Sequence, residues 1–180
     1  MSRAKSKYPT KCTIVIDTRE KPENALFQES EEGDKEVAAY VREKIDAGDY
    51  TIKEIPNLVV IEKKQNGKEL WGNLVLKKDR FLRSVERMRV FKHKYIIIQQ
   101  TYAEFLDVKN WAHVAKGYPR RYQAIAAIES WLISLSQSEG IHFIWAGEKY
   151  APRIAKKILC KSYEWQRKRL MKEDKEKTDE

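Results

Sequence analysis

Three short polar strings bring together the side chains of this 180-residue chain that could do chemistry. They are Asp17-Thr18-Arg19-Glu20, Gly48-Asp49-Tyr50 and Glu62-Lys63-Lys64. The first string closes a β-branched run and the third follows another, and apolar runs bounded by polar residues are typical of buried strands. We therefore expect the carboxylates at strand ends, where the backbone fixes their direction.

The chemistry expected of such carboxylates is metal-assisted attack on a phosphate. Hard divalent cations such as Mg²⁺ bind oxygen ligands and keep several waters, and they polarise phosphate and acidify bound water. Carboxylates that converge repel one another unless a cation intervenes. We expect Asp49 and Glu62 to bind the metal directly and Asp17 to act as a further or water-mediated ligand. A carboxylate at one strand end, followed by Glu-x-Lys at the next, is typical of nucleases.

The other residues of the strings receive supporting roles. Lys64 lies two residues after Glu62, so both side chains project from the same face of a strand. It is expected to position the nucleophilic water or to offset charge that develops on the phosphate. Glu20 is expected to complete the negative pocket as an additional or indirect ligand, and Arg19 to brace the cluster or contact a phosphate.

Charge is distributed unevenly along the chain. The formal net charge is +9, with residues 1–69 contributing −1 and residues 70–180 contributing +10. A balanced half that carries the carboxylates and a strongly basic remainder suit a polyanionic substrate. The sequence contains no apolar stretch long enough to span a membrane, and the basic first residues lack the apolar region of a secretory signal. Its two cysteines, Cys12 and Cys160, are expected to be reduced thiols, which together predict a cytoplasmic protein.

Two basic groups are candidates for DNA contact. Lys77, Arg80, Arg83 and Arg87 recur every three or four residues, which predicts one exposed helical stripe. Arg120 and Arg121 open another expected helix, whose free N–H groups attract phosphate. Each group could instead be a solvated surface without a ligand.

The wider pattern predicts an α/β fold. We expect strands at 13–16, 49–55, 58–64, 95–99 and 141–146, and helices at 36–47, 69–91, 119–136 and from Pro152 onward. A short helix and a loop are expected over 102–118. Residues 1–171 are assigned to a single domain, and 172–180 to a charged, disordered tail. The fold class expected is a three-layer sandwich with a mixed central sheet and helices on both faces.

The strings also resemble the XPF-type structure-specific endonuclease family, whose pattern is Asp-x-Arg-Glu, then Gly-Asp, then Glu-Arg-Lys, three residues and Asp. Residues 69–74 are similar to the helix opening that follows in the family, and the resemblance covers roughly residues 12–160. Two positions depart from the pattern. Lys63 replaces the family's arginine, and Lys68 stands where the closing aspartate is expected, although one inserted residue would let Glu69 take that place.

The resemblance implies a restriction-endonuclease-like nuclease domain that uses Mg²⁺ or Mn²⁺ and no small-molecule cofactor. Its substrate would be DNA with a flap, a fork or another junction between duplex and single strand. Roles in recombination, repair or replication-fork processing would follow, and a homodimer is compatible with the resemblance because family members often pair through this domain. The chain resembles compact forms carried by bacteriophages, which would place it in the bacterial or host cytosol.

Two other readings stay open from the sequence. A metal-dependent DNA exonuclease or a generic restriction-type nuclease shares the Asp and Glu-x-Lys core. A DNA-binding scaffold subunit without activity is the second alternative, although the retained carboxylates and Lys64 argue against it. Dependence of cutting on a free DNA end, or metal-independent binding without product, would distinguish these readings.

Overall fold

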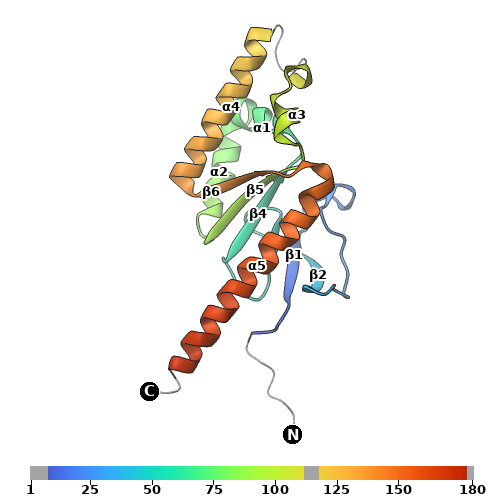
Figure 1. Ribbon diagram of the computed structural model, residues 1–180, viewed down its shortest axis with the longest axis vertical. Coiled ribbons are helices and arrows are strands. Elements are labelled where there is room, and N and C mark those ends of the chain that lie inside the picture. Colours follow the sequence, from blue (N-terminus) through green and yellow to red (C-terminus); the bar gives the residue numbers. More distant parts are fainter. Residues whose placement is uncertain (1–7, 112–117, 178–180) are drawn as a thin grey trace.

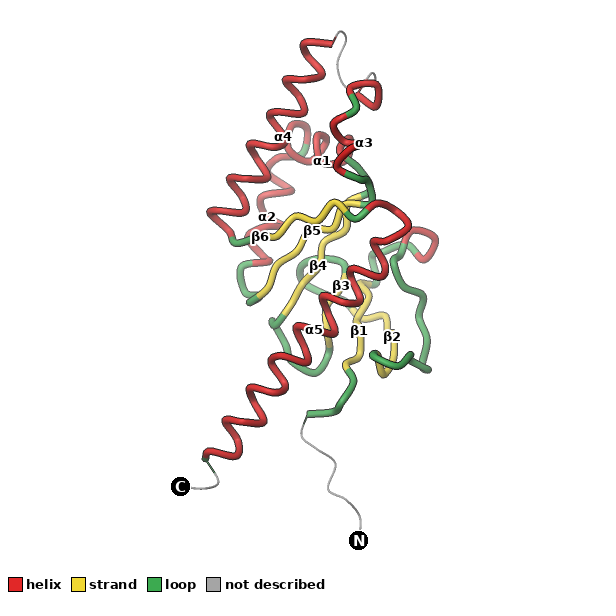
Figure 2. The backbone as a smooth tube through the Cα atoms, viewed as in Figure 1, coloured by secondary structure: helices red, strands yellow, loops and turns green. Residues whose placement is uncertain are grey.

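The computed structural model describes residues 8–111 and 118–177, which fold around one mixed β-sheet (Figures 1 and 2). The strands lie in the order β2-β1-β3-β4-β5-β6. Their bounds are β1 Cys12–Asp17, β2 Val37–Glu43, β3 Tyr50–Ile52, β4 Val59–Lys64, β5 His93–Ile98 and β6 Ile141–Trp145. The expected mixed sheet is confirmed, with one strand more than the sequence indicated.

The strand directions bring the three polar strings to one edge of the sheet. β1 is parallel to β2, and β4, β5 and β6 are parallel to one another. β3 runs antiparallel to both β1 and β4. The carboxyl ends of β1 and β4 therefore meet the beginning of β3, and Asp17, Asp49 and Glu62 come from these three strand ends.

Helices cover both faces of the sheet. On one face, α5 (Gly147–Glu176) packs Ala151, Ala155 and Leu159 against strand residues that include Ile14 and Ile61. The other face carries α1 (Gly67–Trp71), α2 (Lys78–Met88) and α4 (Tyr118–Glu139), which pack around Ile96 and Ile98 of β5. Because side chains alternate along a strand, these runs supply both cores. The three-layer α/β sandwich expected from the sequence is confirmed.

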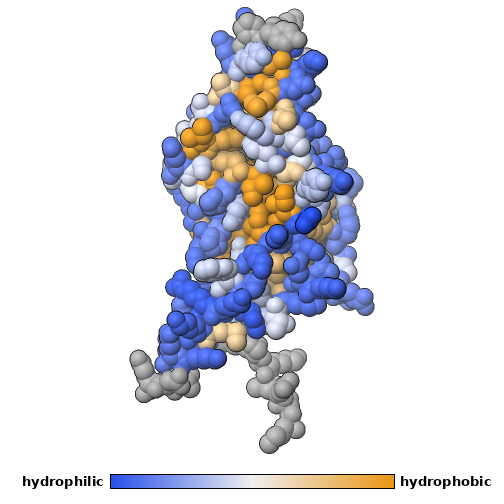
Figure 3. All heavy atoms as spheres, in the orientation of Figure 1, coloured by the Kyte–Doolittle hydropathy of each residue, from blue (hydrophilic) through white to orange (hydrophobic). Residues whose placement is uncertain are grey.

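Short helices and surface character complete the description. α3 (Tyr102–Leu106) and 3₁₀ turns at Pro22–Asn24 and Val108–Trp111 connect the larger elements. Hydrophobic side chains gather over α4 and the neighbouring strands, whereas hydrophilic ones cover the lower half of α5 (Figure 3). Among the described residues, no helix is both long and apolar enough to cross a membrane.

The prediction of a helix at 36–47 is wrong, because this segment forms strand β2. Its apolar residues fit helical spacing, but pairing with β1 decides the conformation: Tyr40 lies opposite Ile14 and Val41 opposite Val15. Only Val37 is buried in this edge strand. A local pattern of apolar residues does not contain that tertiary contact.

The helix expected at 69–91 is interrupted. After α1 the chain forms one π-helical turn, Gly72–Leu76, in which Lys77 N donates to Gly72 O at 3.0 Å. The Asn73 side chain donates to Glu69 O at 2.7 Å and so takes a carbonyl from the regular helical ladder. α2 therefore begins at Lys78, and it buries Phe81, Val85 and Met88.

The last two helices also differ from expectation. α4 extends three residues beyond the expected end at 136, and not all of its apolar residues are buried, since Ile133 faces solvent. α5 begins five residues before Pro152, which lies inside the helix. It also continues to Glu176 through part of the segment expected to be a disordered tail, and i,i+4 pairs such as Arg169–Glu173 hold this stretch. The domain boundary at 171 stays a prediction.

Candidate active site at the edge of strands β1, β3 and β4

Asp49 is placed by a backbone bridge between two strands. Asp17 N donates to Asp49 O at 2.9 Å, and Asp49 N donates to Ile61 O at 2.8 Å. The preceding Gly48 has φ +74°, and a Cβ there would lie 2.3 Å from Val60 Cγ2. Only glycine fits that conformation and that space. The Gly-Asp string is therefore a structural requirement for delivering Asp49 to this edge.

The Asp49 carboxylate sits in an environment that opposes its charge. Burial and the neighbouring carboxylate of Glu62 raise the pKa of Asp49 to about 8, although Lys63 N donates to Asp49 Oδ2 at 2.7 Å. Its other oxygen has no hydrogen-bond partner among the described residues. A cation near Asp49 and Glu62 would relieve this repulsion.

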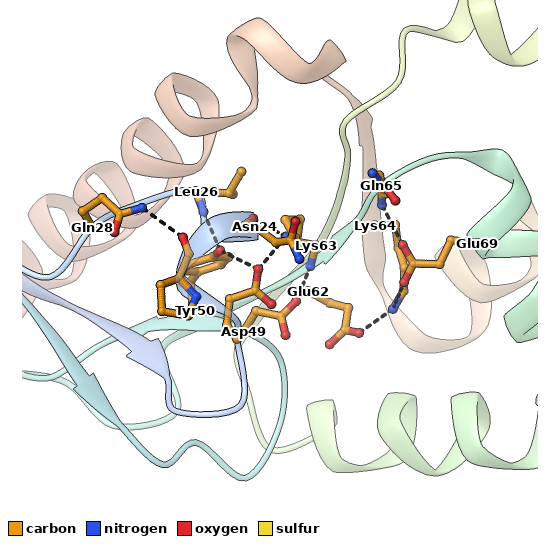
Figure 4. A network of polar contacts seen from close by, with 12 residues as sticks. Asn24, Leu26, Gln28, Asp49, Tyr50, Glu62, Lys63, Lys64, Gln65 and Glu69 are labelled. Carbon is orange, nitrogen blue, oxygen red and sulfur yellow. Dashed lines mark hydrogen bonds and ion pairs between the residues drawn. The ribbon is translucent and has the colours of Figure 1, made fainter.

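Lys64 is a buried cation held between two carboxylates. Its Nζ lies 2.6 Å from Glu62 Oε1 and 3.4 Å from Glu69 Oε1, and its side chain is 7% exposed. Burial alone lowers the pKa of Lys64, but Glu62 and Glu69 outweigh it and the pKa is raised. Figure 4 shows Asp49 and Glu62 side by side, with Lys64 and Glu69 beyond Glu62. This contact shows that the side chains of Glu62 and Lys64 project from the same face of β4, as expected.

Asp17 is occupied by Arg19 and by the chain that follows β2. Its two carboxylate oxygens accept hydrogen bonds from Arg19 Nε and Nη2, both at 2.8 Å, and one also accepts from Ile45 N at 3.0 Å. Burial raises the pKa of Asp17, but these hydrogen bonds outweigh it and the pKa is lowered. This side chain is 1% exposed and does not line the hollows described below. Asp17 as a further or water-mediated metal ligand stays a prediction, and in this geometry its carboxylate positions Arg19.

Glu20 and Lys63 form a separate pair on the other face of β4. Lys63 Nζ lies 2.5 Å from Glu20 Oε1 and donates to Asn24 O, and both side chains are largely buried. Tyr50 Oη donates to the same carboxylate at 3.5 Å. Lys63, which replaces the arginine of the family pattern, therefore fixes Glu20 and the following turn.

Two hollows meet at these residues. The first, of about 430 Å³, extends along α2, and we call it the α2 cleft. The second, of about 340 Å³, lies beside Glu20 and Lys63, and we call it the central hollow. The residues that line both are Arg19, Asp49, Glu62, Lys64 and Glu69. A ligand in either hollow can reach this set, which we call the charged cluster.

The basic residues predicted to contact DNA are divided by the structure. Lys77, Arg80 and Arg87 line the α2 cleft. Arg83 lines a different hollow with Asp79 and Glu86. Ser84 lines the α2 cleft at the place expected for Arg83. Arg120 and Arg121 lie at the beginning of α4, at the top of Figure 1, and line neither hollow of the charged cluster. Most of the loop expected before this helix, residues 112–117, lies outside the described residues.

Asp49 and Glu62 are the residues that fit a divalent cation. Each has one oxygen bonded to a lysine N–H group and one oxygen without a hydrogen-bond partner among the described residues. Within the described ranges, no three His, Cys, Asp or Glu side chains form a complete metal site. Mg²⁺ needs no such set, because it is usually held by one or two carboxylates, waters and substrate phosphate.

The sequence patterns did not identify some of the residues that line the two hollows. Glu69 was expected only if one residue is inserted in the family pattern, and it lies in both hollows, where it also accepts from Gln65 N at 2.7 Å. Asn73 and Ser84 line the α2 cleft. The signal for Ser84 was its four-residue spacing from Arg80, which charge counting overlooks.

A mixed sheet that presents paired carboxylates and a lysine at one edge agrees with the restriction-endonuclease-like α/β fold expected from the sequence. The sequence profile of the ERCC4 domain matches residues 16–151, so the chain belongs to the ERCC4 domain family. The resemblance seen in the sequence is thereby confirmed. Curated protein sequences gave no match.

Solved structures agree on the fold. XPF from Aeropyrum pernix aligns with a TM-score of 0.53 and 14% identity, over 81% of this chain and 64% of that chain. The same protein in complex with DNA aligns with a TM-score of 0.53 and 14% identity, over 84% and 64%. This chain thus spans less than two thirds of the length of that protein.

Proposed function

We propose that this protein is a divalent-metal-dependent DNA endonuclease that hydrolyses phosphodiester bonds at branched or flapped DNA. The observation that carries the proposal is the charged cluster, in which Asp49, Glu62 and Lys64 border an α2 cleft that also contains Lys77 and Arg80. Acidic groups for a cation beside basic groups for phosphate are the two requirements of such a reaction. Membership of the ERCC4 domain family and the solved complex of Aeropyrum pernix XPF with DNA support it.

Each residue of the cluster has a role in this proposal. Asp49 and Glu62 would hold Mg²⁺ or Mn²⁺, which supplies Lewis-acid activation of phosphate and water. Lys64, already 2.6 Å from Glu62, orients the attacking water and offsets charge on the phosphate. Arg19, oriented by Asp17, contacts a phosphate oxygen. The Glu20–Lys63 pair fixes the wall of the central hollow.

Cleavage of defined DNA substrates tests the proposal. End-labelled flap, fork, linear duplex and single-stranded DNA would be incubated with Mg²⁺, Mn²⁺ or a chelator. We expect metal-dependent nicking near the junction, lost in Asp49→Ala and retained in Asp46→Ala, which removes an exposed carboxylate nearby. Cutting of all substrates from their ends would favour an exonuclease instead. Binding without product in either metal would leave a scaffold subunit.

The oligomeric state and the biological role are part of the same proposal. A homodimer is proposed from the family resemblance, and sedimentation across a range of protein concentrations tests it. The proposed role is recombination, repair or replication-fork processing in a bacterial or phage-infected cytoplasm. Rescue of a junction-processing defect by the intact gene, but not by the Asp49→Ala form, would support that role.

A further inference from the structure

A third hollow lies beyond the central hollow and has no role in the proposed reaction. It measures about 560 Å³, and its walls include Gln100 after β5 and Glu148 at the beginning of α5. Asn24, Gln65 and Gln99 line both this hollow and the central hollow, so the two adjoin. In Figure 4, Asn24 and Gln65 lie on one side of Asp49 and Glu62. We call this third hollow the amide pocket.

The charge of the amide pocket is opposite to that of the α2 cleft. Among the described residues that line the amide pocket there is no lysine or arginine, and three are glutamates: Glu23, Glu104 and Glu148. The α2 cleft contains Lys77 and Arg80 among its cations. A DNA phosphate is therefore attracted to the α2 cleft and repelled from the amide pocket. Any part of DNA that enters the amide pocket must be uncharged.

Several polar groups of the amide pocket are free to bind a ligand. The side-chain amides of Gln65 and Gln99 and the carboxylates of Glu23 and Glu148 have no hydrogen-bond partner among the described residues. Other wall residues are held in place, since Gln100 Oε1 accepts from Gly67 N at 2.8 Å. The pocket therefore combines fixed walls with unsatisfied amide and carboxylate groups.

The remaining wall suits a planar ring. Ala25, Leu26 and Pro152 line the amide pocket and add an apolar surface. Apolar side chains pack against base faces, and Asn or Gln side chains read base edges through paired donors and acceptors. Carboxylates accept hydrogen bonds from exocyclic amino groups, as in contacts of Glu with cytosine N4. Thymine has no such amino group.

We propose that the amide pocket binds the base of an unpaired nucleotide next to the scissile phosphate and favours a base with an exocyclic amino group. The inference rests on the proposed function, because it takes DNA as the ligand of the charged cluster. A paired base is stacked in the duplex and its edge is occupied, so the occupant is a base that the junction leaves free. The shared residues Gln65 and Gln99 place that base beside the reacting phosphate.

The test compares cytosine with thymine, which have similar size. Flap substrates would differ only by dC or dT at each unpaired position beside the junction, and binding in chelator and cleavage in Mg²⁺ would be measured. We expect about 5-fold or greater preference for dC at one position. The preference should approach unity in Glu23→Ala/Glu148→Ala, because both glutamates are exposed and their loss spares the core. The control Glu29→Ala/Glu176→Ala removes the same charge elsewhere on the surface and should keep the preference.

A fluorescent base gives a second readout that does not depend on cleavage. The adenine analogue 2-aminopurine, which carries an exocyclic amino group, would replace the base at the preferred position. Its emission should change on binding to the wild type and the control, and less on binding to Glu23→Ala/Glu148→Ala. Equal use of dC and dT, with normal binding and cleavage, would overturn the base pocket and leave the nuclease proposal intact. Absence of DNA binding would overturn both.

Discussion

Asp17 and Arg19 form a two-point ion pair in which both carboxylate oxygens accept from one guanidinium, each at 2.8 Å. The same carboxylate binds the backbone N–H of Ile45, which follows the edge strand β2. One buried aspartate therefore ties together β1, the chain after β2 and the arginine that borders both hollows. This explains how a residue outside the hollows contributes to the site.

Replacing Asp17 with Asn should destabilise the protein, because the amide cannot satisfy Arg19 and Ile45 together. We expect a loss of about 1–3 kcal/mol in the free energy of unfolding, measured by urea denaturation at pH 7. Since the pKa of Asp17 is held below its ordinary value of 3.8, its stabilisation is lost as the pH falls through that region. The difference between variant and wild type should therefore shrink in acid. Asp46→Asn, on the exposed surface, is the control and should change little.

Asp49 should make the metal-free protein less stable as the pH rises. Its pKa of about 8 lies above its ordinary 3.8, so the folded state keeps a proton that the unfolded state releases between these values. Stability is then greatest below pH 4 for this group and falls up to pH 8. Asp49→Asn should remove that fall. The free energy of unfolding of the variant relative to the wild type should therefore rise between pH 5 and pH 9, as urea midpoints in chelator would show. Parallel pH profiles would contradict the assigned environment of Asp49.

Arg80 and Arg83 lie on the same helix and should differ in DNA binding. Arg80 lines the α2 cleft, whereas Arg83 lines the hollow with Asp79 and Glu86. Arg80→Ala should weaken binding and reduce the slope of log affinity against log salt by about 0.9, the value for one lost phosphate contact. Arg83→Ala should leave the slope unchanged, as fluorescence anisotropy at several salt concentrations would measure. Equal slopes for the two variants would mean that DNA does not bind in the α2 cleft.

The sequence predicted those features that depend on neighbouring residues. Glu62 and Lys64 share a face because side chains alternate along a strand. It failed where distant contacts decide. β2 is a strand, not the expected helix, because β1 lies beside it. The hydrogen bond from Ile45 N to the Asp17 carboxylate, 28 residues away, is likewise a contact that no local pattern indicates.

The structure divides the predicted basic stripe for a geometric reason. Four cations spaced every three or four residues were predicted to share one face, but 3.6 residues per turn put Arg83 at the margin of that face. Ser84 lies between the cleft-lining Arg80 and Arg87 instead. Charge alone could not show this, since the boundary of the cleft is set by β3 and β4, which bring Asp49 and Glu62 opposite α2.

Cys12 of β1 and Cys160 of α5 are free thiols whose sulfur atoms lie 3.9 Å apart. Oxidised glutathione should convert them to a disulfide, with two thiol hydrogens lost from the protein and two glutathione thiols formed. Intact mass spectrometry should detect the loss, and the urea midpoint should rise because the cross-link restricts the unfolded chain. Cys160→Ser should show neither change. A mixed glutathione adduct as the final product would mean that the two sulfurs cannot approach bonding distance.

Lys64 should matter for cleavage far more than for binding. Its ammonium is buried between Glu62 and Glu69, and its replacement by Met keeps the length of the side chain but removes the charge. The group that orients water and offsets phosphate charge is then lost, so the single-turnover cleavage rate should fall by roughly 10²–10³-fold. DNA affinity in chelator should change only a few-fold, because the exposed cations of the α2 cleft remain. Lys68→Met is the matched control: Lys68 is exposed, lines neither hollow of the charged cluster and should cleave at the wild-type rate. If the Lys64→Met protein cuts as fast as the control, Lys64 takes no part in the reaction. Its role is then that of a counter-ion that holds two carboxylates in place.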